Sequence, residues 1–245
     1  MAINLIFGAS SKQIPWGNAS QIIDADIDKW PIIPDEVRGY YCVIKKGLLV
    51  EVHPISKPSC FLKIALLVES PHKDEFDEIF NPLCPLNGLS GRRFANNIVG
   101  FLEKWFNNSF ISDGKYYFEV KIINPIQYQT SLYHFLNGKI AYNTFGNFSY
   151  TSIDHSLRDE VWRFLYQKCG LEDDFIRRVR IYSPDYVINC CTGSNCYKQF
   201  NANKKIKKTR SKAKNLKALT RESLRSTGLI KSGSYLECKH PISWS

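Results

Sequence analysis

Four short apolar runs constrain the fold of this chain most strongly. They are "KIALLV" (63–68), "FEVKIIN" (118–124), "DYVINCC" (185–191) and "SYLEC" (234–238), and a polar or Gly/Pro-containing break follows each of them. Near-continuous apolar runs of this length are typical of strands that are buried on both faces, as in a mostly parallel sheet.

Helical patterns separate the four runs. Apolar residues recur at helical spacing over 91–106 and 154–170, and the stretch 217–228 ends on a glycine. Gly170 is the predicted stop of the second helix. Because strands and helices alternate, we predict an α/β fold, a three-layer α/β/α domain with a central, mostly parallel four-stranded sheet.

The first 58 residues show no long period and are rich in Pro, Trp and Tyr. We predict that residues 1–58 form an irregular N-terminal extension, packed on a main domain that covers residues 59–245. No run of 18 apolar residues occurs, and no positively charged segment precedes the short apolar patch at the start. These observations argue against a membrane span and a secretory signal, and we predict a cytoplasmic protein.

Eight cysteines are present, but no C-x-x-C pair occurs among them. Zinc sites favour short paired spacings, so the pattern favours buried thiols in a reducing compartment over a metal centre. We therefore predict neither a metal nor another cofactor.

Positive charge is concentrated in one part of the chain. The stretch 204–231 contains eight Lys and three Arg against a single acid, so its net charge of +10 equals that of the whole protein. Such a run is either a solvated loop or faces a polyanion. We favour the second interpretation, with nucleic-acid phosphates as the simplest partner of a Lys/Arg-rich insert at 201–231.

The residues that follow the predicted strands carry the candidate chemistry, because ligands bind beyond the carboxyl ends of the strands in open parallel sheets. Glu69 and Glu75 follow the first run, Asn124 ends the second, and His240 follows the fourth. A carboxylate and an amide that hold a water, opposite a histidine, suit hydrolysis through a cationic transition state, as at the N-glycosidic bond of a nucleoside. No G-x-S-x-G elbow, Walker loop or H-E-x-x-H sequence indicates an esterase, an NTPase or a zincin.

These motifs resemble those of the uracil-DNA glycosylase superfamily over about residues 63–245. "LLVESPHKDE" is similar to the first motif, G-E-x-P-G with a further acid, and "GLSGRRFANNIVGFL" (88–102) to the G-x-x-G-x-x-L helix start. "INP" resembles the second-strand Asn, "INCCTGSNCYKQF" a strand followed by Gly-Ser and a helix, and "HPISWS" the motif His-Pro-Ser-x-x-Ser. The chain departs from the family at Val68, Ser70 and Ile242, and it has no counterpart of the four cluster cysteines of the iron-sulfur branch.

The resemblance implies a role for each matching residue. Glu69 would polarise the attacking water and stabilise the sugar cation, with Glu75 as a supporting acid. Asn124 would hold the water or the base edge, and His240 would hydrogen-bond the leaving base. The implied base pocket comprises Ser70, Pro71, His72, Gly88, Ser90 and Gly91. Trp244 would fill the gap that the flipped nucleotide leaves, and Ser243, Ser194 and Lys198 would also bind DNA. Independently of the resemblance, the charge of the basic insert predicts that DNA phosphates are contacted by Lys204, Lys205, Lys207, Lys208 and Arg210.

The resemblance implies a DNA N-glycosylase that flips a modified base out of double-stranded DNA, leaves an abasic site and works as a monomer. The superfamily includes a bacterial antiphage enzyme that removes α-glucosylated 5-hydroxymethylcytosine from phage DNA. The divergent first motif, the basic insert and the missing cluster cysteines favour this base. The alternatives are a uracil or damaged-base repair glycosylase, a non-catalytic nucleic-acid-binding module, and a metal-dependent nuclease or base-modifying enzyme.

Overall fold

The computed structural model describes most of the chain, in segments. The described residues are 2–7, 10–15, 32–77, 81–109, 111–128, 162–163, 165–167, 169–191, 196–200, 206–210, 215–230 and 233–243. Side chains are described from residue 32 onward, apart from those of Lys73, Ile242 and the strands at 196–200 and 206–210.

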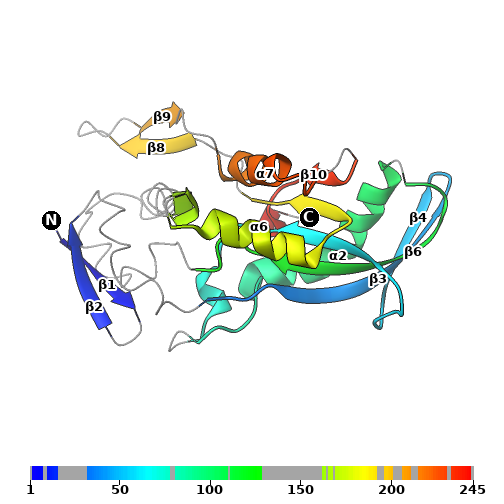
Figure 1. Cartoon of the computed structure of the whole chain (residues 1–245), viewed down its shortest axis with the longest axis horizontal. Helices are drawn as coiled ribbons and strands as arrows, with labels where there is room; N and C mark the ends of the chain where they lie inside the picture. The colour runs from blue at the N-terminus through cyan, green and yellow to red at the C-terminus, as the bar shows by residue number, and fades with distance from the viewer. Residues whose placement is uncertain are drawn as a thin grey trace.

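One mixed sheet of six strands forms the centre of the protein (Figure 1). Its strands lie in the order β10-β7-β5-β6-β3-β4. Four of them are parallel to one another, namely β5 (Leu62–Leu67), β6 (Gly114–Ile123), β7 (Tyr186–Asn189) and β10 (Tyr235–Glu237). These four are the apolar runs of the sequence, so the predicted strands and the α/β class are confirmed.

The sheet has two strands more than we predicted. β3 (Glu36–Lys46) pairs antiparallel with β6, and β4 (Leu49–Ile55) pairs antiparallel with β3 and forms the edge. The prediction of an irregular segment is therefore wrong for residues 36–55, which are part of the same sheet as the residues after 59. Tyr, Val and Ile residues, which favour strands, lie on either side of a turn at Gly47, whose φ is 59°, and support this hairpin.

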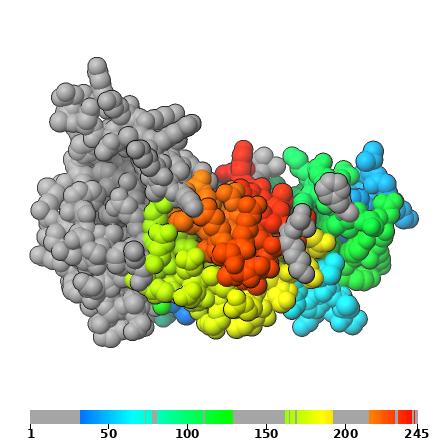
Figure 2. Space-filling view, turned by 45° about the horizontal axis from the view of Figure 1, so that its top comes forward, coloured from blue at the N-terminus to red at the C-terminus, as the bar shows by residue number. Residues whose placement is uncertain are grey.

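Two apolar clusters cover the two faces of the sheet, because neighbouring residues of a buried strand point to opposite sides. Ile64 and Leu66 of β5 pack with α2 (Gly88–Asn107), whose buried residues are Gly91, Phe94, Ile98, Leu102 and Phe106. Ala65 and Leu67 pack with α6 (Leu171–Tyr182), α7 (Leu216–Ser226) and Trp162. Figure 2 shows α6 in yellow and α7 in orange side by side at the surface.

Two of the predicted helices are present, and one further helix was not predicted. The predicted helices over 91–106 and 217–228 correspond to α2 and α7. Residues 165–167 are helical, and Gly170 follows them in the left-handed conformation, with φ 73°, which agrees with the predicted stop; the same residue also caps the beginning of α6, which was not predicted. Most of the predicted helix at 154–170 lies outside the described residues.

Smaller elements complete the chain. β1 (Ala2–Phe7) and β2 (Ser10–Pro15) pair antiparallel, as do β8 (Cys196–Phe200) and β9 (Ile206–Arg210). The resemblance implied a helix after Gly-Ser at 193–194, but residues 196–200 form a strand. The 3-10 turns η2 (Lys73–Glu75) and η3 (Pro241–Ser243) follow β5 and β10. None of the helices in the described part of the chain is both long and apolar enough to cross a membrane.

Candidate functional site

The carboxyl ends of β5 and β6 bring Glu69 and Asn124 together. The two strands are in register to Leu67 and Ile123, and Val68 N donates to Ile123 O at 3.1 Å beyond that point. Ile126 N donates to Glu69 O at 3.3 Å, so the two loops remain joined after the strands end. After β5 the chain continues to β6 on one side, whereas β7 lies on the other side of β5. This is a topological switch point, where open α/β sheets bind ligands.

Glu69 is held in an unusual conformation at this switch point. Its φ of 146° lies in a region that L-residues rarely adopt, and the residue is only 3% exposed. Trp162 Nε1 donates to its carbonyl at 3.1 Å. Burial is the main cause that raises the pKa of the Cys191 thiol, and the charge of Glu69 is the second. The Glu69 carboxylate therefore lies within electrostatic reach of the end of β7. A strained backbone at a strand end is characteristic of functional positions, and here it holds a buried carboxylate.

Asn124 is anchored by its backbone, whereas its side chain has no hydrogen-bond partner among the described residues. Arg178 donates to Asn124 O at 3.0 Å and to Pro125 O at 3.2 Å, and it forms an ion pair with Asp35 at 2.7 Å. Although Asn124 is 1% exposed, neither its amide nitrogen nor its amide oxygen has a hydrogen-bond partner in the described part of the chain. Buried amides are almost always paired, so this one is ready to hold a water or a ligand edge.

Glu75 is a buried acid beside the first turn of α2. It is 3% exposed, and its Oε2 has no hydrogen-bond partner among the described residues. Burial raises the pKa of Glu75 from 4.5 to about 8, against backbone hydrogen bonds at His72 and Leu86 and the charge of Arg38, all of which lower it. The side chain is therefore mostly protonated at neutral pH and can donate a hydrogen bond.

This pKa predicts how stability depends on pH. The pKa of Glu75 is higher in the folded state than in the unfolded state, so the buried side chain does not lower stability below pH 4.5, where it is protonated in both states. Above this pH the unfolded state loses the proton and the folded state keeps it, so the free energy of unfolding falls until the pH reaches about 8. We expect Glu75→Gln to be close to the wild type at pH 4.5 and to be more stable at pH 8.5, by up to about 5 kcal/mol, because the pKa rises from 4.5 to about 8 on folding. Urea unfolding across this range measures the difference. Glu51→Gln, at an exposed strand position, is the control, and a constant gap between Glu75→Gln and wild type would contradict the assignment.

The loop after β5 lies against the beginning of α2. Asn87 Nδ2 donates to Asp74 O at 2.7 Å, and a Cβ at Gly88, whose φ is 69°, would overlap Asp74. A Cβ at Gly91 would overlap the carbonyl oxygen of Leu86. Both positions of the G-x-x-G sequence therefore require glycine, because neighbouring atoms approach the backbone too closely for a Cβ. The close contact brings the predicted pocket residues in the loop after β5 near those at the start of α2.

His240 lies on the far side of β7 from Glu69. It follows β10, which is two strands from β5, and its carbonyl accepts from Ser243 N at 2.8 Å within η3. η3 packs on α2. Because β10 is parallel to β5 and β6, the segment that follows β10 lies at the same carboxyl edge of the sheet as Glu69 and Asn124. His240 is half-buried there and Ser243 is exposed.

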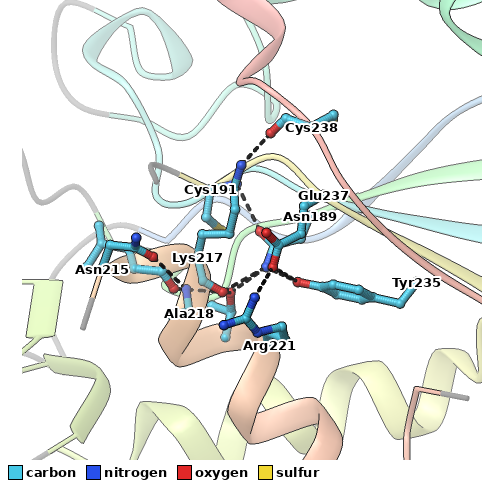
Figure 3. Close-up of polar contacts among 11 residues, drawn as sticks. Asn189, Cys191, Asn215, Lys217, Ala218, Arg221, Tyr235, Glu237 and Cys238 are labelled. Carbon is cyan, nitrogen blue, oxygen red and sulfur yellow. Dashed lines mark hydrogen bonds and ion pairs between the residues drawn. The ribbon is translucent and has the colours of Figure 1, made fainter. Parts of the chain in front are cut away.

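A buried amide joins β7, β10 and α7 behind this segment (Figure 3). Asn189 is fully buried, and its Nδ2 lies 2.8 Å from both Thr220 Oγ1 and Tyr235 OH. Its Oδ1 accepts from Cys191 N at 3.0 Å, and Lys217 Nζ donates to Cys238 O at 2.5 Å. The network fixes the first turn of α7 to the strand ends from which Cys191 and His240 extend.

The basic insert is attached to the same edge. The chain leaves β7 at Cys191 and enters α7 at Asn215, whose side chain caps the helix by accepting from Ala218 N at 2.8 Å. Asn189 contacts both points, because its Nδ2 also donates to Lys217 O at 3.2 Å. The β8–β9 hairpin is therefore joined at both ends to the edge that carries Glu69, not to the opposite edge.

The remaining predicted site residues divide into three groups. Pro71 is buried, Ser70 and Ser90 are half-buried, and His72 is exposed with its Nδ1 3.5 Å from Asp74 Oδ2. Lys198, Lys207, Lys208 and Arg210 are in the hairpin, for which only the backbone is described. The predictions for Trp244, Ser194, Lys204 and Lys205 fall outside the described residues.

Sequence reasoning did not identify Arg178, Trp162 or Asn189. Arg178 contacts Asp35, and Trp162 contacts Glu69. Because the partners in each contact are far apart in the sequence, no local spacing indicates either one. Asn189 follows the apolar pair Val187 and Ile188, as Asn124 follows Ile122 and Ile123, and this parallel was an available signal. In the described residues no group of three or more His, Cys, Asp or Glu side chains is arranged to hold a metal ion. Comparison of the chain with family models, curated proteins and solved structures finds no match.

Proposed function

We propose that the protein is a DNA N-glycosylase of the uracil-DNA glycosylase type, which flips a modified base out of the duplex and hydrolyses its glycosidic bond. One observation carries the proposal: Asn124, whose buried amide has no hydrogen-bond partner among the described residues, and the buried Glu69 lie on neighbouring strand ends at a topological switch point. A non-catalytic binding module has no need to bury an amide without partners and a carboxylate on a strained backbone together.

In the proposed reaction, Glu69 and Asn124 hold the water that attacks the anomeric carbon. The carboxylate also stabilises the positive charge that develops on the sugar, while His240 stabilises the negative charge on the departing base. Glu75, protonated at neutral pH, donates a hydrogen bond at the side of the pocket formed by the start of α2. We also propose that the domain has the three-layer α/β/α architecture of the superfamily. The packing of α2 on one face of the sheet and of α6 and α7 on the other supports this proposal.

We propose α-glucosyl-5-hydroxymethylcytosine in phage DNA as the excised base. In the uracil enzymes an aromatic residue of the first motif closes the pocket, and the corresponding residue here is His72. Its side chain is 56% exposed, which supports a pocket open on this side and able to accept a bulky base.

Three duplexes test the proposal, one unmodified, one containing uracil and one containing α-glucosyl-5-hydroxymethylcytosine. We expect alkali-labile sites in the glucosylated duplex only, and in the presence of a chelator, because the chemistry requires no metal. Cleavage of the uracil duplex alone would make the protein a repair glycosylase, and cleavage only with a divalent metal would indicate a nuclease. Binding without cleavage of any duplex would contradict the glycosylase proposal.

The attachment of the basic insert predicts that it contacts the same DNA as the site. Changing Lys204, Lys205, Lys207 and Lys208 to Gln should lower the slope of log K against log salt by about 2 to 4, since each phosphate contact contributes roughly 0.9. The same change at four exposed cations of the opposite edge is the control, at Lys46, Lys104, Lys115 and Arg180. Equal slopes in the wild type and in the insert variant would make the insert a solvated loop.

A further inference from the structure

Two thiols meet where the third and fourth parallel strands end. Cys190 Sγ and Cys238 Sγ are 2.9 Å apart, although 48 positions separate the two residues in the sequence. β7 and β10 are in register up to Asn189 and Glu237, so Cys190 and Cys238 are the next pair, and Cys238 N donates to Asn189 O at 3.0 Å. The contact therefore belongs to the sheet pairing itself.

The backbone geometry of this pair already suits a disulfide. Neighbouring strands lie about 4.8 Å apart, and disulfides form between Cα atoms that are about 4.4 to 6.8 Å apart. The Sγ atoms must approach from 2.9 Å to about 2.05 Å, a shift that side-chain rotation supplies. Hydrogen bonds hold both ends, because Cys190 N donates to Leu67 O at 2.8 Å and Lys217 Nζ donates to Cys238 O at 2.5 Å.

The two thiols differ in their access to solvent. Cys190 is fully buried between β5 and β10, whereas Cys238 is partly exposed. Burial raises the pKa of the Cys190 thiol, and Cys190 is accordingly the poorer first nucleophile. An oxidant therefore meets Cys238 first, with Cys190 in contact to complete the reaction.

We propose that Cys190 and Cys238 form a reversible oxidation site for peroxides, in which the two thiols become a disulfide that fastens β10 to β7. The Cys238 sulfur attacks one peroxide oxygen, the O–O bond breaks, and a sulfenic acid and one water form. The Cys190 sulfur then attacks the sulfenic sulfur, the S–S bond forms, the S–O bond breaks, and a second water leaves with the Cys190 proton. Two thiols and one hydrogen peroxide thus give one disulfide and two waters, sulfur being oxidised and oxygen reduced.

The position of the pair gives this modification a consequence. β10 is an edge strand of three residues, and the segment with His240 follows it directly. The cross-link encloses the basic insert and α7, which lie between the two cysteines in the chain. A closed loop of this length raises the midpoint of thermal unfolding by roughly 5 to 10 °C.

The test uses the full-length protein, treated with equimolar hydrogen peroxide and then alkylated. We expect a mass loss of two hydrogens before alkylation, a peptide that links Cys190 to Cys238, the rise in unfolding midpoint, and reversal of all three by dithiothreitol. Cys238→Ser should abolish the cross-link, whereas Cys60→Ser, at an exposed cysteine, should leave it unchanged.

Three outcomes would overturn the site. They are no intramolecular cross-link, a cross-link of Cys190 to another cysteine such as its neighbour Cys191, and irreversible oxidation of Cys238 without a disulfide. Because fragmentation of the wild-type peptide distinguishes Cys190 from Cys191, the result does not depend on whether a variant folds. It is also independent of the proposed glycosylase activity, since every readout is chemical or thermal.

Discussion

Replacement of Glu69 by glutamine is expected to lower the rate of base excision by about 10²- to 10⁴-fold while leaving DNA affinity nearly unchanged. The amide keeps the shape of the side chain but removes the charge that, in the proposed reaction, orients the water and stabilises the sugar cation. Single-turnover kinetics on the glucosylated duplex measure the chemical step, and a fluorescence binding assay measures the affinity.

Glu119→Gln is the matched control for this substitution. Glu119 is also a buried carboxylate, 6% exposed, but it lies in the middle of β6, away from the carboxyl edge. Its loss should therefore change stability and not the single-turnover rate. If Glu69→Gln and Glu119→Gln lower this rate equally, Glu69 has no special part in the chemistry.

Arg178→Met is expected to destabilise the protein by about 3 to 5 kcal/mol, because it leaves Asp35 buried without its partner. The side chains of Arg178 and Asp35 are only 12% and 9% exposed, and a single Arg178 nitrogen, Nη2, also donates to the carbonyls of Asn124 and Pro125. Chemical denaturation measures the free energy of unfolding.

A neighbouring arginine provides the control for Arg178. Arg177 pairs with Asp174 at the surface, where its side chain is 62% exposed. Arg177→Met should therefore change stability by less than about 1 kcal/mol. Similar losses in the two variants would mean that the Arg178–Asp35 pair contributes no more than an exposed ion pair does.

Local pattern was sufficient to predict the parallel strands and two helices. Each parallel strand is a near-continuous apolar run, and the stripe of Phe94, Ile98 and Leu102 identifies α2. β3 and β4 were not predicted because their polar and apolar residues are mixed with Tyr and Pro and form no regular pattern. In addition, β3 pairs with β6, which is far from it in the sequence. α6 was missed because a glycine can begin a helix as well as end one, although acids in its first turn and Arg180 in its last turn were signals of a helix.

The candidate site was predictable in part. The positions of Glu69, Asn124 and His240 follow from the rule that parallel strands end at one edge. The backbone strain at Glu69 and the environment of the Asn124 amide depend on contacts with residues far away in the sequence, such as Trp162 and Arg178. No local sequence pattern predicts these contacts. The attachment of the basic insert has no local signal in the sequence either, because only the hydrogen bonds of Asn189 show that α7 begins beside the end of β7.

The anchoring by Asn189 has an evolutionary consequence. Residues 192–214 leave and re-enter the α/β unit at two neighbouring points that one buried amide holds together. The segment between Cys191 and Asn215 can therefore become longer, shorter or different in sequence without a change in the position of any strand of the sheet. The length and charge of this segment can therefore diverge among related proteins while the arrangement of Glu69 and Asn124 is retained.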